Sequence, residues 1–178
     1  AILGLPKGTE HFISDIHGEY RFFIHILKNA SGSVRRKIAQ CFAEEGMSEE
    51  NVNALATLIY YPKEKLALLK EENGPLSEEW YTATLLHLVQ VCRKATSKYT
   101  RSKVRKAMPR DFAYIIDELL NYSEADEDDN RTTYVHNIVR NIIEVGSADA
   151  FIIAISELIQ HAVIDKLHIV GDVFDRGN

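Results

Sequence analysis

The sequence of 178 residues has few of the features that mark secreted, membrane-bound or nucleic-acid-binding proteins. Its two cysteines, Cys41 and Cys92, form neither a CxxC motif nor a disulfide framework, so a reducing compartment, the cytoplasm, is expected. No apolar run approaches the roughly 18 residues that cross a membrane, and no charged-then-apolar leader opens the chain. Lys and Arg number 21 against 26 Asp and Glu, and this net charge of −5 gives non-specific nucleic-acid binding no support. We therefore expect a soluble globular protein without nucleic-acid or membrane partners.

Proline and glycine are also scarce through the middle of the chain. Only three of the nine glycines, Gly46, Gly74 and Gly146, fall between positions 33 and 170, and the chain has four prolines in all. Because these residues interrupt regular structure, their scarcity favours helices over this region. The apolar residues agree, since they recur at the spacing of a helix face.

Local signals place several helix ends. Ser48 and Ser77 are good N-caps, Pro62 suits the first turn of another helix, and Ser147 is expected to cap the last one. The helix that starts after Ser77 is expected to continue until Pro109 breaks it. The expected helices cover roughly residues 22–27, 34–42, 48–59, 63–72, 77–108, 110–122, 132–145 and 147–165.

The two ends of the chain differ in pattern from the middle. Two short apolar runs near the ends each stop at a polar turn that carries a carboxylate, as buried strands do in open α/β sheets. We therefore expect a mainly α protein with two short parallel strands, which is a partial α/β domain carrying a long helical insertion. The first strand and a metal motif occupy residues 1–18, the helical insertion 19–166, and the second strand with its own motif 167–178.

The first strand leads into Asp15-Ile16-His17-Gly18. Residues two apart on an extended segment point the same way, so Asp15 and His17 can share one metal ion. Gly18 lets the chain turn sharply after them. By itself D-x-H is a weak motif, and a capping aspartate beside a surface histidine is its more frequent explanation.

The second strand leads into Gly171-Asp172-Val173-Phe174-Asp175-Arg176-Gly177. Its carboxylates suit a hard or borderline cation, and its guanidinium suits a bidentate grip on phosphate. The alternative is an Asp-rich turn with a surface ion pair. The position of both motifs disfavours that alternative, because each follows an expected strand and D-x-H precedes G-D-x-x-D-R-G in the chain.

Together, D-x-H followed by G-D-x-x-D-R-G resembles the calcineurin-like metallophosphoesterase superfamily. That superfamily usually separates the two motifs by one short crossover, whereas Asp15 and Asp172 are 157 positions apart here. The stretches 5–11, 97–103 and 112–115 resemble one branch, the bacterial class III fructose-1,6-bisphosphatases. The resemblance covers essentially the whole chain. Because that family's members are several times longer, it implies an N-terminal part of such a protein, without most of the phosphatase domain.

The resemblance also assigns roles to the matching positions. Asp15 and His17 match ligands of a first metal ion, and Asp172 matches the carboxylate that bridges two. Asp175 matches a carboxylate that orients a catalytic histidine, and Arg176 matches the clamp on the reacting phosphate, so these two are the expected catalytic residues. The family's later G-N-H-[ED] motif and further histidine ligands are missing from the chain. The resemblance therefore implies an incomplete metal site and little activity of the chain by itself.

Residues 93–110 carry eight basic residues and no acidic one. On one continuous helix, Lys94, Lys98, Arg101 and Arg105 would form a single stripe. Because like charges repel, an anion is expected to face the stripe, and we assign Lys98, Arg101 and Arg105 to the second phosphate of a bisphosphate substrate or to an anionic effector. The alternative is a helix face that is solvated or paired with acids elsewhere in the fold.

The function implied by the resemblance is the hydrolysis of fructose 1,6-bisphosphate to fructose 6-phosphate and phosphate, a reaction of gluconeogenesis. A dinuclear manganese site in the whole protein would assist it. One alternative is a phosphatase of the same superfamily that acts on a phosphoprotein or a dinucleoside polyphosphate, since the two motifs are shared. Another is a helical regulatory or interaction module bounded by phosphatase strands. The sequence leaves homo-oligomer formation and the effector open.

Overall fold

The computed structural model describes residues 10–13, 32–121, 129–164 and 166–169, and helices make up most of them. In chain order the elements are β1 (Glu10–Ile13), α2 (Ser33–Cys41), α3 (Glu49–Tyr60), α4 (Pro62–Asn73), α5 (Glu78–Thr96), α6 (Arg101–Ala107), a 3₁₀ turn (Arg110–Phe112), α7 (Ala113–Asn121), α8 (Asp129–Glu144), α9 (Ala148–Ala162) and β2 (Lys166–Ile169). None of the helices in this described part is long and apolar enough to cross a membrane.

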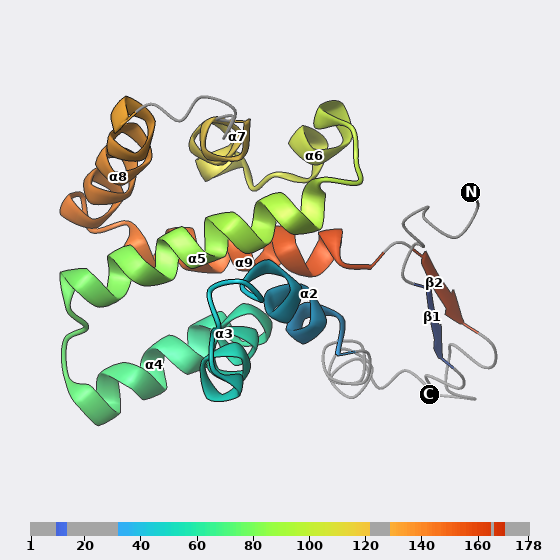
Figure 1. Cartoon of the computed structure of the whole chain (residues 1–178), viewed down its shortest axis with the longest axis horizontal. Helices are drawn as coiled ribbons and strands as arrows, with labels where there is room; N and C mark the ends of the chain where they lie inside the picture. Colours follow the sequence, from blue (N-terminus) through green and yellow to red (C-terminus); the bar gives the residue numbers. More distant parts are fainter. Residues whose placement is uncertain (1–9, 14–31, 122–128, 165, 170–178) are drawn as a thin grey trace, which may run out of the picture.

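The helices form three layers, and the middle layer is a central pair (Figure 1). Helices α5 and α9 pack along each other in the middle. Helices α2, α3 and α4 cover one side of this pair, and α6, α7 and α8 cover the other. The pair is therefore enclosed from both sides, and its two helices hold more buried residues than any other helix of the described part.

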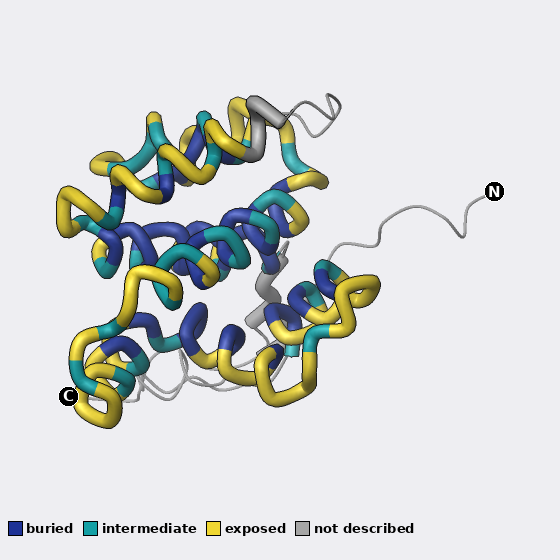
Figure 2. The backbone as a smooth tube through the Cα atoms, turned by 60° about the vertical axis from the view of Figure 1, so that its left-hand side comes forward, coloured by how far each residue is buried: buried dark blue, intermediate teal, exposed yellow. Residues whose placement is uncertain are grey.

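The core lies between these layers. Phe151, Ile155 and Ile159 are fully buried along one face of α9, and Leu85 and Leu88 are fully buried on α5. Their spacing of three or four residues places each set on one helix face. Figure 2 shows the buried segments concentrated in the middle of the bundle and the exposed ones on the outer turns. Each such side chain contributes about 1.5–3 kcal/mol through removal of apolar surface from water.

The expected helix starts are confirmed at all four positions, since α3, α4, α5 and α9 begin where the sequence indicates. The hydroxyl oxygens of Ser48 and Ser77 accept hydrogen bonds from backbone amides three residues on, at 3.2 and 3.1 Å. Pro62 occupies the first turn of α4. Ser147 occupies the N-cap position of α9 as expected, but the expected cap is wrong in one respect, because its side chain makes no capping hydrogen bond. The helix expected over 22–27 lies outside the described residues.

Removing a cap should be measurable only where the cap exists. Ser48→Ala and Ser77→Ala should each lower the free energy of unfolding by about 1 kcal/mol, since each leaves a helix amide without its acceptor. Ser147→Ala is the matched control and should change the free energy of unfolding by less than about 0.5 kcal/mol. Urea unfolding followed by circular dichroism measures all three. A loss for Ser147→Ala as large as the other two would contradict this account.

The expected long helix up to Pro109 is wrong, because it is two helices. Helix α5 ends at Thr96, and α6 starts at Arg101. The hydroxyls of Thr96 and Ser97 donate to carbonyls of the preceding turn at 2.8 and 2.9 Å, and Thr100 caps the new helix by accepting from a backbone amide at 3.4 Å. Such short polar side chains compete with the helix for its own backbone groups and so favour a break here.

The expected fold class also needs correction, because the described residues do not form a partial α/β domain. Strands β1 and β2 pair in parallel, but the ladder is only four residues long on each side. No helix among the described residues packs extensively against it, whereas the sheet of an α/β domain is covered by helices. The helices instead bury their apolar faces on one another, around α5 and α9. The described structure is therefore a helical bundle with a short ladder beside it.

Candidate functional site

The predicted metal and catalytic residues come after the two strands of the ladder. Ile13 pairs with Ile169 in the register, so the carboxyl ends of β1 and β2 lie side by side. The five predicted residues follow these ends in the sequence and lie outside the described residues: Asp15, His17, Asp172, Asp175 and Arg176. Within the described ranges, no group of three His, Cys, Asp or Glu residues could hold a metal ion. The metal site stays a prediction from the sequence.

The predicted phosphate-binding stripe is divided between two elements. Lys94 belongs to α5, Lys98 lies in the connection after it, and Arg101 and Arg105 belong to α6. The stripe required one continuous helix, so its geometry is wrong. Figure 1 shows α6 on the side of the bundle near the amino ends of the two strands, while the predicted motifs follow their carboxyl ends. The substrate-binding role of Lys98, Arg101 and Arg105 stays a prediction that this arrangement does not support.

Asp117 on α7 pairs with two of the four cations of α6. Arg101 donates to both of its carboxylate oxygens, from Nη2 at 2.7 Å and from Nε at 3.3 Å, and the Nε atom of Arg105 lies 3.9 Å away. The Asn121 side chain adds a hydrogen bond of 2.7 Å. The Asp117 side chain is only 12% exposed, so the charged form depends on these partners. For Arg101 and Arg105 this pairing agrees with the alternative that the sequence left open, a helix face paired with acids elsewhere in the fold.

The hydrogen bond from Arg101 is the main cause that lowers the pKa of Asp117 below its usual value, while burial acts in the opposite direction. A carboxyl group whose pKa is lower in the folded state stabilises the fold above its unfolded pKa, which is about 3.9. That stabilisation is lost as the pH falls through the lower, folded pKa.

Asp117→Asn should therefore reduce stability in a pH-dependent way. The difference in free energy of unfolding between the wild type and this variant should be constant above about pH 5 and should shrink below about pH 4. Urea unfolding between pH 3 and 7 measures it. The matched control is Asp111→Asn, which changes an exposed aspartate and should show no such dependence. A difference that grows towards low pH would contradict the Arg101–Asp117 pairing.

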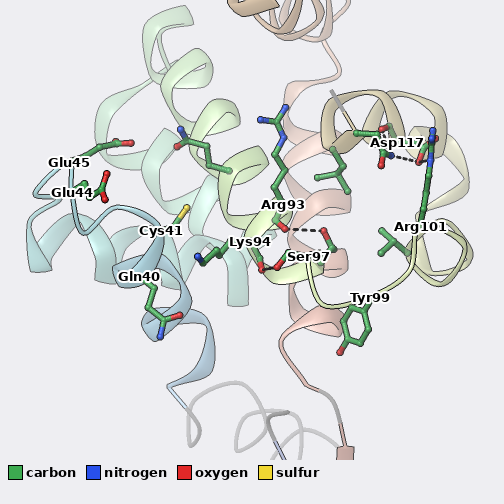
Figure 3. A pocket seen from close by; sticks show the side chains of 15 residues that line it. Gln40, Cys41, Glu44, Glu45, Arg93, Lys94, Ser97, Tyr99, Arg101 and Asp117 are labelled. Carbon is green, nitrogen blue, oxygen red and sulfur yellow. Dashed lines mark hydrogen bonds and ion pairs between the residues drawn. The ribbon is translucent and has the colours of Figure 1, made fainter. Parts of the chain in front are cut away.

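A cavity of about 700 Å³ lies among α2, α5, α6 and α7 (Figure 3). Arg93 lines it and donates from Nε and Nη2 to the Leu119 carbonyl at 2.9 and 2.5 Å, which caps the end of α7. Three bases and three acids share the lining: Arg93, Lys94, Arg101, Glu44, Glu45 and Asp117. Because these charges balance, the cleft offers a polar surface but no net attraction for a phosphate.

Sequence reasoning missed this cleft because its walls come from distant segments of the chain. The available signal was Arg93, a charged residue that stands beside the fully buried Cys92 on α5. A half-buried arginine indicates a polar partner, but its spacing in the sequence does not identify the Leu119 carbonyl, 26 positions away. Burial raises the pKa of the Cys92 thiol to about 12, so this cysteine is unreactive in the fold.

Comparison with known proteins gives a consistent result over the whole sequence. The model of the family described as Firmicute fructose-1,6-bisphosphatase matches residues 1–178. A fructose-1,6-bisphosphatase class 3 of Clostridium tetani is 58% identical over 177 residues, and one of Alkaliphilus metalliredigens is 58% identical over 179 residues. One of Porphyromonas gingivalis is 56% identical over 177 residues.

These matches cover 99% of this chain and 26% of each relative. The chain therefore spans about a quarter of the length of the curated relatives it matches. No solved structure matches it.

Proposed function

The chain belongs to the Firmicute fructose-1,6-bisphosphatase family, and from this premise we propose that it forms part of a metal-dependent phosphatase in the cytoplasm. The proposed reaction is the hydrolysis of fructose 1,6-bisphosphate to fructose 6-phosphate and phosphate, a step of gluconeogenesis. The observation that carries this proposal is the parallel register of β1 and β2. It supports a common site because the two motifs directly follow, in the sequence, the neighbouring carboxyl ends of two paired strands.

The donor set fits a divalent cation such as Mn²⁺. Asp15, His17 and Asp172 would hold the metal, since two carboxylates and an imidazole suit a borderline cation. The metal would supply Lewis-acid chemistry to the phosphoryl group. These three donors are fewer than a dinuclear site holds, so we propose that the remaining ligands come from the rest of the whole protein.

The other two motif residues, Arg176 and Asp175, contribute to substrate binding and to proton transfer. Arg176 binds phosphoryl oxygens, because its planar guanidinium donates two parallel hydrogen bonds and stays charged at all physiological pH values. It thereby stabilises charge that spreads over these oxygens during transfer. Asp175 holds an imidazole of the whole protein in the orientation that lets it donate a proton to the leaving sugar oxygen.

Calorimetry with Mn²⁺ tests the donor set in this chain. A site with three donors should bind Mn²⁺ only weakly, with a dissociation constant in the micromolar to millimolar range, because missing charged ligands lower the affinity for hard cations. Asp15→Ala should abolish the binding, whereas Asp111→Ala, which removes an exposed carboxylate from the bundle, should leave it unchanged.

Two outcomes would contradict the assignment. Tight binding of two ions by the wild-type chain would show that the site is already complete. Equal binding by the Asp15→Ala variant and the wild type would place the metal elsewhere.

A further inference from the structure

A second cavity, of about 220 Å³, lies between α6 and the end of α9. Val104, Leu158 and Ala162 line it and are almost fully buried. The Thr96 hydroxyl is directed to a carbonyl of its own helix at 2.8 Å, and the Tyr99 hydroxyl donates to the Ala162 carbonyl at 3.2 Å. The polar atoms of the floor are thus engaged within the protein, and the floor offers an apolar surface to a ligand.

The rim of this cavity carries positive charge. Lys103 supplies this charge, lines the cavity and is exposed, and the exposed side chain of His161 lines it too. The Nζ atom of Lys103 lies 4.4 Å from the centre of the Tyr99 ring, a cation–π contact that holds the ammonium at the mouth. Among the described residues that line this cavity, none is Asp or Glu. In contrast to the polar cleft, whose charges balance, this cavity therefore attracts an anionic group.

The size of the cavity limits the ligand. An apolar protein cavity of about 150 Å³ accommodates a benzene ring, whereas pockets for drug-sized ligands start at about 300 Å³. A volume of about 220 Å³ therefore suits a ring-sized apolar body with one small polar group.

We propose that this α6–α9 pocket binds a small carboxylic acid with a ring-sized apolar body. The body occupies the floor formed by Val104, Leu158 and Ala162, and the carboxylate pairs with Lys103 at the rim. The site is independent of the proposed phosphatase motifs, which follow the strand ends. It stands where α9 leads towards β2, since Ile164 lines it and β2 begins at Lys166. A bound acid therefore holds the end of α9 against α6.

Benzoate is a suitable probe, with binding measured by calorimetry or NMR titration of this chain. Benzamide has the same shape without the charge and should bind at least about fivefold more weakly. Lys103→Gln should weaken benzoate binding at least about fivefold. Lys106→Gln is the matched control, because it removes an exposed cation of the same helix that does not line the pocket, and it should bind benzoate as the wild type does.

A pocket-filling variant tests the apolar part. Ala107 lines the pocket and is exposed, so Ala107→Leu places a larger side chain there without opening the core, and it should abolish benzoate binding. Circular dichroism and thermal unfolding establish that both pocket variants are folded.

Three results would overturn the proposal. One is equal binding of benzoate and benzamide, and another is an equal loss in Lys103→Gln and Lys106→Gln. The third is self-association of the chain that Ala107→Leu abolishes, with no benzoate binding, which would make the pocket part of an interface between copies.

Discussion

Replacing Asp172 by asparagine in a full-length family member that contains this chain should lower kcat for fructose 1,6-bisphosphate by roughly a thousandfold or more. The change keeps the size of the side chain and removes only its negative charge. In the proposed site Asp172 is a metal ligand, and a neutral amide in its place would weaken the hold on the cations, which contribute several kcal/mol of transition-state stabilisation in metal-dependent enzymes. A thousandfold loss corresponds to about 4 kcal/mol. Initial rates at saturating substrate and Mn²⁺ measure the effect.

Asp111→Asn is the matched control, since it makes the same chemical change at an exposed position of the bundle. It should leave kcat within about twofold of the wild type. The manganese content of the purified variants gives a second reading, because loss of Asp172 should lower it and loss of Asp111 should not. A kcat for Asp172→Asn within tenfold of the wild type would contradict the metal-ligand role.

The helix starts could be predicted because their determinants are local. Ser48 and Ser77 each stand next to the amides that they cap, and Pro62 fits its place through its own fixed backbone angle. Ser147 matches the same sequence pattern. Its oxygen makes no such bond because the backbone there is not in the extended conformation that the other two caps have, with a ψ angle of 5° in place of 152° or 158°.

Contacts between distant segments determine the partners of the ion pairs, which the sequence did not show. The charge pattern of residues 93–110 permitted one long helix, but the fold breaks it before Arg101 and turns that side chain towards Asp117, 16 positions away. In the same way, the sequence does not identify the partners of Asp149 in the first turn of α9. This carboxylate accepts hydrogen bonds from Tyr81, at 2.8 Å, and from Lys70, joining α4, α5 and α9. The sequence does not show which of the 26 acidic residues of the chain pairs with which basic residue.

The candidate catalytic site differs from these ion pairs, because its residues are identified by local motifs and not by contacts between distant segments. Its residues are predicted from two short motifs, whose chemistry depends on residue types at fixed spacing and not on the packing of the helices. What the sequence could not supply was the alignment of the strands. A one-residue shift in register would turn the side chains of one strand to the opposite face. The observed pairing of Ile13 with Ile169 fixes which ends meet, and the family relationship adds the reaction as a proposal.

Phe151→Ala should cost about 3–5 kcal/mol of unfolding free energy, the largest loss expected from a single change in the bundle. Phe151 is fully buried on α9 and packs edge to face on Phe112, with ring centres 5.4 Å apart. Truncation removes this contact and leaves a cavity between the central and outer layers. Urea unfolding should show a lower midpoint with an unchanged m-value. Tyr114→Ala is the control, because this aromatic side chain is 78% exposed and its loss should change stability by less than about 0.5 kcal/mol.

A domain of this size has about 5–15 kcal/mol of stability in all, so Phe151→Ala could leave too little of the folded state to measure. Ile155→Val is a milder change in the same core that leaves enough folded protein to measure. Ile155 is fully buried one turn further along α9, and the loss of one methyl group there should cost about 0.5–1.5 kcal/mol. The ordering Phe151→Ala, then Ile155→Val, then Tyr114→Ala follows from burial alone. If Tyr114→Ala destabilised the chain more than Ile155→Val, the core would not lie around α9, and the layered arrangement of the bundle would be wrong.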